Sequence, residues 1–192
     1  MNKYLLFLIV LFTFKGSIAQ QPAPTMELRE NGFSGADSTK NYVVIEVPKV
    51  SKADLYKKTL TFINGLYNDP QHVVTTVDGE SLTVNAKTDA IHGVNPSYKY
   101  PTSYSIVIEF KEGKIKFAPK ILEFSEIWAA NRPPSKYYVS GKDSPTPSEV
   151  NCIWIFDKND KRILFNPELK VSFDRWVNNC IAGIQTKVND TW

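Results

Sequence analysis

The stretch YVVIEVPKVSKADLY, residues 42–56, decides the fold, because a strand ends and a helix begins within it. Residues 42–47 are dense in Val and Ile, which predicts a strand, and Pro48 ends it. Ser51 is a favourable N-cap, and Asp54 three residues later gives a pattern close to a capping box. Beyond it, apolar residues recur at helical spacing, so we expect a strand followed directly by an amphipathic helix.

The residues that follow predict an antiparallel sheet. Segments 72–77 and 81–87 are joined by Asp78-Gly79, a strong hairpin signal, and Glu112-Gly113 joins segments 103–111 and 114–124 in the same way. Apolar residues alternate with polar ones along these segments, which is typical of a sheet with one buried face. On the opposite face we expect Val44, Val74 and Val107.

A long apolar stripe predicts a final helix. Asn166 is a candidate N-cap, and Pro167 suits the first helical position. From Leu169 to Val188, apolar residues recur along one face. With a helix at each end of a strand meander, the fold class we expect is α+β: a two-layer domain over residues 41–190, with an antiparallel sheet and the helices on one face.

Residues 125–165 form an aromatic-rich insertion in this domain. Its rings either cover the outer face of the sheet or form a binding surface for a protein, a glycan or an apolar small molecule. The candidates for that surface are Trp128, Tyr137, Tyr138 and Trp154. Segments 152–156 and 162–165 predict one more hairpin.

The pattern from residue 41 to 124, carried by Tyr42-Val43-Val44-Ile45-Glu46-Val47 and Ser51-Lys52-Ala53-Asp54-Leu55-Tyr56, resembles exported bacterial domains of unknown function that have a TATA-binding-protein-like (TBP-like) fold. The resemblance implies the order strand, helix, four strands, helix, and it implies no activity. With two extra strands, the order also resembles helix-grip domains, in which a long helix closes a cavity for an apolar ligand.

The first residues have the features of a secretory signal peptide. Lys3 is followed by an apolar run from Tyr4 to Phe14, and Ser17-Ile18-Ala19 fits a cleavage site. The run is too short to span a bilayer, and no cysteine lies at the cleavage site to carry a lipid. We therefore expect residues 1–19 to be removed, no transmembrane segment in the mature chain, and a periplasmic or secreted protein that is not a lipoprotein. Residues 20–40, polar with Pro and Gly, predict a flexible linker.

Charge and cysteine content narrow the function further. The chain has a formal net charge of +3, and cleavage removes two lysines and no acid, which leaves +1. A nearly neutral protein is not expected to bind nucleic acid. Cys152 and Cys180 could form a disulfide in an oxidising compartment, or remain as two buried thiols.

The sequence contains no nucleophile elbow, P-loop or HExxH motif. Asp89 and His92 could form an acid–base pair, but no nucleophile accompanies them. We therefore expect no cofactor, no metal and no enzymatic activity, and predict a binding or protein-interaction module of the cell envelope. The alternatives are a helix-grip carrier of an apolar ligand and an enzyme of unrecognised type.

Overall fold

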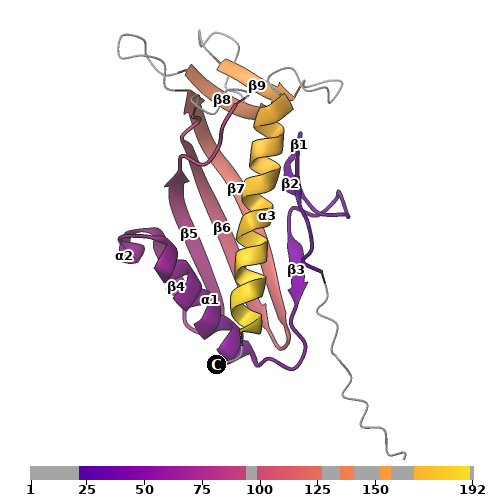
Figure 1. Ribbon diagram of the computed structural model, residues 1–192, viewed down its shortest axis with the longest axis vertical. Coiled ribbons are helices and arrows are strands. Elements are labelled where there is room, and N and C mark those ends of the chain that lie inside the picture. Colours follow the sequence, from indigo (N-terminus) through magenta and orange to yellow (C-terminus); the bar gives the residue numbers. More distant parts are fainter. Residues whose placement is uncertain (1–21, 94–98, 127–134, 141–151, 157–166, 191–192) are drawn as a thin grey trace, which may run out of the picture.

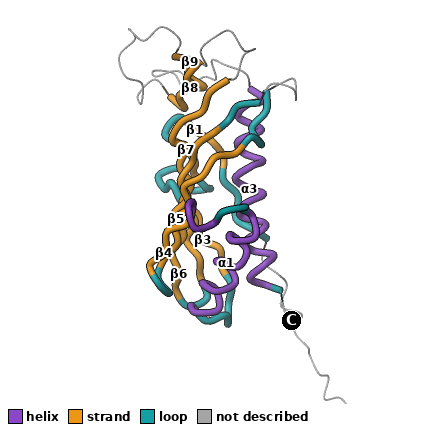
Figure 2. The backbone as a smooth tube through the Cα atoms, turned by 90° about the vertical axis from the view of Figure 1, so that its left-hand side faces the viewer, coloured by secondary structure: helices purple, strands orange, loops and turns teal. Residues whose placement is uncertain are grey.

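The computed structural model describes residues 22–93, 99–126, 135–140, 152–156 and 167–190. In these residues the long helices lie on one face of a sheet, which makes two layers (Figures 1 and 2). The helices are α1 (Lys52–Leu66), α2 (Pro70–Val73) and α3 (Pro167–Asn189). The strands are β1 (Glu27–Arg29), β2 (Gly32–Ser34), β3 (Val43–Glu46), β4 (Val74–Val77), β5 (Ser81–Thr88), β6 (Thr102–Lys111), β7 (Lys114–Glu126), β8 (Ser135–Ser140) and β9 (Cys152–Phe156). The predicted α+β class is confirmed.

Helix α1 begins at the predicted cap. The Ser51 hydroxyl accepts a hydrogen bond from the Asp54 backbone N–H at 3.1 Å and donates to the Asp54 carboxylate at 2.7 Å. One backbone donor that the first turn leaves without a helical partner is thereby satisfied. The helix then buries Leu55, Thr59 and Ile63 against the rest of the core.

The main sheet has seven strands in the order β4-β5-β6-β7-β8-β9, and β3 also pairs with β7. Because β6 occupies one edge of β7, strands β3 and β8 share its other edge, β3 at the start of β7 and β8 at its end. The antiparallel prediction holds except for β9, which runs parallel to β8. The expected hairpin of segments 152–156 and 162–165 stays a prediction, because residues 162–165 lie outside the described residues.

The core lies between α3 and the inner face of the sheet. Helix α3 contributes Leu169, Phe173, Val177, Ile181, Ile184 and Val188, each at most 1 % exposed. The sheet contributes Leu82, Val84, Ile106, Ile108, Ile115 and Phe117, each at most 3 % exposed. This apolar contact is the main force that holds the two layers together.

The outer face of the sheet carries two of the three valines predicted for it. Val44 and Val107 are 37 % and 36 % exposed. Val74 instead packs against the core, because its register partner Val84 points inward. Strands β8 and β9 extend the sheet and bury Ile155 in the same core, so the described part of the aromatic-rich insertion does not cover the outer face.

The prediction of a flexible linker over residues 20–40 is wrong for its central part. Strands β1 and β2 form a hairpin that lies beside α3 (Figure 1). Met26, Leu28 and Phe33 are at most 3 % exposed and belong to the core. Each strand has three residues, which is too short to show a periodic pattern, so the burial of this hairpin follows from its contact with α3.

Among the helices of the described residues, none combines the length and the apolar character needed to cross a membrane.

Candidate functional site

Of the four predicted aromatic residues, only Tyr137 has a side chain that the structure describes. Trp128 lies outside the described residues, and Tyr138 and Trp154 are described only as backbone positions in β8 and β9. Tyr137 is 2 % exposed, and its ring stacks on Phe124 at a centroid distance of 5.5 Å. Tyr137 is therefore a core residue, and its assignment to a binding surface is wrong.

Of the two alternatives for Cys152 and Cys180, the disulfide is not formed. Cys180 is a free, half-buried thiol on α3, and burial raises its pKa to about 11. It lies beside the α1 residues Phe62 and Leu66. Cys152 begins β9, which lies near the N-terminal end of α3, whereas Cys180 lies farther along that helix (Figure 1). The two residues are thus separated in the direction of the helix axis.

Asp89 and His92 do not form an acid–base pair. Asp89 is exposed, whereas the His92 backbone N–H donates to the Ser172 hydroxyl of α3 at 2.9 Å. No hydrogen bond or ion pair between the two side chains occurs in the structure. Across the described ranges, no group of three or more His, Cys, Asp or Glu side chains is arranged to hold a metal ion.

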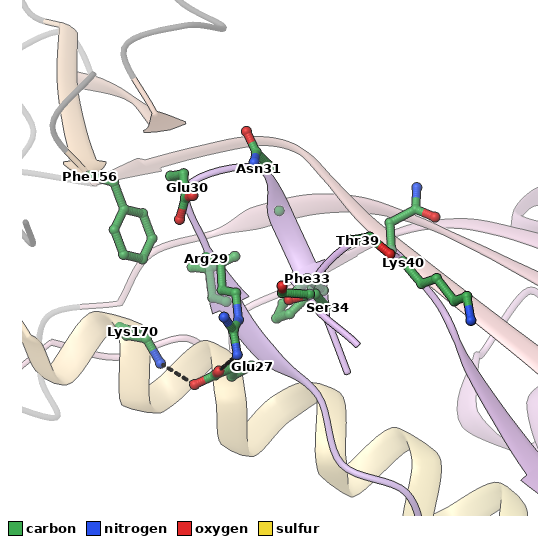
Figure 3. Close-up of a pocket in the computed structure, with 14 residues that line it drawn as sticks. Glu27, Arg29, Glu30, Asn31, Phe33, Ser34, Thr39, Lys40, Phe156 and Lys170 are labelled. Atoms are coloured by element: carbon green, nitrogen blue, oxygen red, sulfur yellow. Dashed lines mark hydrogen bonds and ion pairs between the residues drawn. The ribbon is translucent and has the colours of Figure 1, made fainter. Parts of the chain in front are cut away.

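Within the described residues, a candidate site lies on the hairpin β1–β2, on the face that turns away from the core. It is a pocket of about 420 Å³, called here the hairpin pocket (Figure 3). Its walls are the hairpin, the segment after it and one side of α3. They are formed by Glu27, Leu28, Arg29, Glu30, Asn31, Gly32, Phe33, Ser34, Ser38, Thr39, Lys40, Asn41, Phe156 and Lys170.

Polar side chains of α3 fix the position of the hairpin. The Asn178 side chain accepts from the Met26 N–H and donates to the Met26 carbonyl, both at 2.9 Å. The Asp174 carboxylate accepts from the Leu28 N–H at 2.6 Å. These hydrogen bonds give partners to backbone N–H and C=O groups along the outer edge of β1. Without α3, those groups would have no partner within the protein.

Register explains why polar groups of the hairpin converge on the pocket. Leu28 pairs with Phe33, and both point into the core. The alternate pair, Glu27 and Ser34, therefore points to the other face, together with Arg29. Gly32, opposite Arg29, has a φ of 100°, and a Cβ atom there would meet no other atom within 4 Å, so the pocket stays open at this position.

The charged groups of the pocket are connected to one another. Glu27 pairs with Arg29 and, at 3.6 Å, with Lys170 (Figure 3). Lys170 also pairs with Asp174 at 2.7 Å. On the far wall, Lys40 pairs with Asp37 at 2.9 Å. Each lysine and arginine that lines the pocket thus has a carboxylate partner.

Two buried polar atoms in the pocket have no hydrogen-bond partner in the protein. They are the Ser34 hydroxyl oxygen, on a residue that is 5 % exposed, and the Arg29 Nε. Leaving a buried polar group unsatisfied costs about 1–3 kcal/mol. Such groups occur at sites where a water molecule or a ligand completes the hydrogen bonding.

A turn centred on Asp37 shapes the far wall. Its carboxylate accepts from the Thr39 N–H at 3.1 Å and from the Thr39 hydroxyl at 2.6 Å. Together with the ion pair to Lys40, these hydrogen bonds lower the pKa of Asp37 to about 2. These contacts shape the far wall in the absence of a ligand.

The sequence analysis missed this site because it interpreted residues 20–40 as a linker. One local signal was present: Asn31-Gly32 is a hairpin dipeptide, and it is preceded by Leu28 and followed by Phe33. The pairing of those two apolar residues on one face could have indicated a short buried hairpin. The position of Lys170 beside the hairpin could not have been predicted from the sequence, because Lys170 belongs to α3.

No family model and no curated protein matches the chain. Two solved structures share its architecture. A TBP-like protein from Parabacteroides distasonis has a TM-score of 0.57 and 12 % identity, over 79 % of this chain and 92 % of the other. A DUF4468 family protein from Bacteroides ovatus has a TM-score of 0.55 and 9 % identity, over 78 % and 85 %. The fold is therefore TBP-like, as the resemblance implied.

Proposed function

We propose that this chain works outside the cytoplasm as a non-enzymatic binding module of the cell envelope, and that it holds a small polar ligand in the hairpin pocket. The volume of about 420 Å³ is in the usual range for small-molecule sites. The signal-peptide pattern of residues 1–19 supports the location.

One observation carries the proposal. The pocket is preorganised by hydrogen bonds to α3 and by the Asp37 turn, yet it leaves the Ser34 hydroxyl and the Arg29 Nε without partners. A site that is fixed in shape and incomplete in hydrogen bonding favours binding, because little ordering cost remains when the ligand arrives.

The packing between α3 and the sheet disfavours the alternative of a helix-grip carrier. Phe173, Val177 and Ile184 fill this interface and are at most 1 % exposed. An apolar groove of about 260 Å³ does occur beside Phe62 and Trp176, but it opens at the surface between α1 and α3. It is not the enclosed cavity that such a carrier needs.

The test is native mass spectrometry of the full chain, expressed in its own host and purified gently from the envelope. We expect a non-covalent small molecule that is released on denaturation. The Ser38→Trp variant places a large ring on the exposed wall of the pocket and should lose the added mass. In the matched control Thr75→Trp, the ring stands on the exposed edge strand β4, and the added mass should remain.

Two results would contradict the proposal. One is a bare protein mass for the wild type. The other is a bound molecule that both variants retain equally, because that molecule would occupy another site. Recovery of the protein from the cytoplasm with residues 1–19 still attached would contradict the proposed location.

A further inference from the structure

The hydrogen-bonding groups of the hairpin pocket that carry no charge indicate what kind of ligand fits it. Five lining side chains end in a hydroxyl or an amide: Asn31, Ser34, Ser38, Thr39 and Asn41. Hydroxyls both donate and accept hydrogen bonds, and amides present one acceptor and two donors. A ligand rich in hydroxyl groups, which also donate and accept, matches this set.

The charge balance argues against an ionic ligand. Lys40 and Lys170 each contact a carboxylate at less than 3 Å, and Arg29 is paired with Glu27. The lining and its ion-pair partners comprise three cations and four carboxylates, which include Glu30. An anionic ligand would have to compete with the carboxylates that already pair with the three cations. A cationic ligand would find an excess of only one carboxylate, which is too little negative charge to select it.

The apolar groups of the pocket argue against an apolar ligand. Leu28, Phe33 and Phe156 line it, but they are at most 4 % exposed. Their apolar surface is already buried in the core. An apolar ligand would therefore bury little further apolar surface in this pocket and gain little binding free energy. What remains accessible is polar and nearly neutral as a whole.

We propose that the hairpin pocket binds an uncharged saccharide. This inference rests on the proposed binding function and adds the chemical class of the ligand. Sugar hydroxyls would supply the missing acceptor to the Arg29 Nε–H and a partner to the Ser34 hydroxyl. The ion-paired Arg29 and Glu27 lie next to each other at the pocket, so a donor and an acceptor are both available there to neighbouring sugar hydroxyls (Figure 3).

The experiment is a titration of the full mature chain, labelled with ¹⁵N, in which amide shifts are followed by NMR. The probes are the neutral sugars glucose, galactose, mannose, xylose and N-acetylglucosamine. Matched charged probes are glucuronate and glucosamine, which keep the glucose ring and add one negative or one positive charge. We expect saturable shifts for at least one neutral sugar, at amides of residues 27–41, with at least tenfold weaker binding of the charged probes.

Variants separate binding from structure. Ser34→Ala removes a hydroxyl that has no partner in the protein, so the unfolding midpoint should not fall, whereas sugar affinity should drop about tenfold. The matched control is Thr59→Val on the buried face of α1, which removes the other hydroxyl that is buried without a partner in the part of the chain that the structure describes. It should leave sugar affinity unchanged. Arg29→Lys keeps the charge but removes Nε, and it should also weaken binding.

Each other outcome overturns the saccharide proposal. Preferred binding of glucuronate or glucosamine would show a charged ligand. An absence of shifts with every sugar, or equal affinity in Ser34→Ala and wild type, would show that the unpartnered groups hold a structural water only. In either case a small molecule found by native mass spectrometry and lost in Ser38→Trp would keep the proposed binding function, with a different ligand.

Discussion

Two hairpins of this protein differ in the strength of their local turn signal and in how deeply their first or second strand is buried. The hairpin β4–β5 has a clear local signal in Asp78-Gly79, but β4 is an exposed edge strand, and its Val77 is 58 % exposed. The hairpin β1–β2 lies in a segment interpreted as a linker, but Phe33 is 2 % exposed. A strong turn signal therefore says that a hairpin forms, and it does not say how much that hairpin contributes to the core.

The difference comes from what each hairpin contacts. Hairpin β1–β2 packs on α3 and hydrogen-bonds to Asn178 and Asp174, partners 152 and 146 residues away. Hairpin β4–β5 is supported by its neighbour β6 in the sheet, through pairing that continues along β5. The first hairpin depends on the last helix and carries the hairpin pocket. The second places an exposed sheet edge in β4, and its contribution to the core comes from Leu82 and Val84 of β5.

The comparison of the two hairpins predicts its largest effect on the free energy of unfolding. Phe33→Ala should lower the free energy of unfolding by about 3–5 kcal/mol, because the ring fills space against Phe173 and Trp176 and leaves a cavity when removed. Val77→Ala in β4 should change it by less than about 0.5 kcal/mol. Urea denaturation of both variants measures the difference. A loss below about 1 kcal/mol for Phe33→Ala would mean that hairpin β1–β2 is not part of the cooperative core.

A smaller effect should follow removal of the polar contact to α3. Asn178→Ala leaves the buried backbone groups of Met26 without partners and should cost about 1–3 kcal/mol. Hydrogen exchange at the Met26 amide should accelerate more than exchange in β6. The neighbouring Asn179, which is exposed on the same helix, gives the control Asn179→Ala. Equal exchange rates at Met26 in both variants would show that Asn178 does not hold the hairpin.

The smallest effect concerns pH and the wall of the hairpin pocket. The pKa of Asp37 is lowered from 3.8 to about 2, first by the hydrogen bond from the Thr39 side chain. A depressed pKa in the folded state means that the stabilisation is complete above about pH 4 and is lost as pH falls through about 2. The Thr39 amide shift should follow this titration in NMR spectra, with a midpoint near 2. A midpoint near 3.8 would indicate that the turn is open in solution.

Much of the fold could be predicted because its signals are local. The cap at Ser51, the turns at Asp78-Gly79 and Glu112-Gly113, and the stripe of α3 each involve residues close together in the chain. The direction of β9 could not be predicted in this way, because it follows from pairing with β8 and not from a local turn signal. The burial of Tyr137 could not be predicted either, because an aromatic ring suits a core and an interface equally.

The sequence by itself determined the α+β class, the order of most strands and the two long helices, since helix and strand periodicity is a property of neighbouring residues. Only the tertiary structure decided that residues 26–34 belong to the core, that Cys180 is a free thiol, and that Glu27, Ser34 and Lys170 line one pocket. The physical reason is that these features depend on where α3 lies relative to the first strands and to β9, and no one of these segments carries local information about that arrangement.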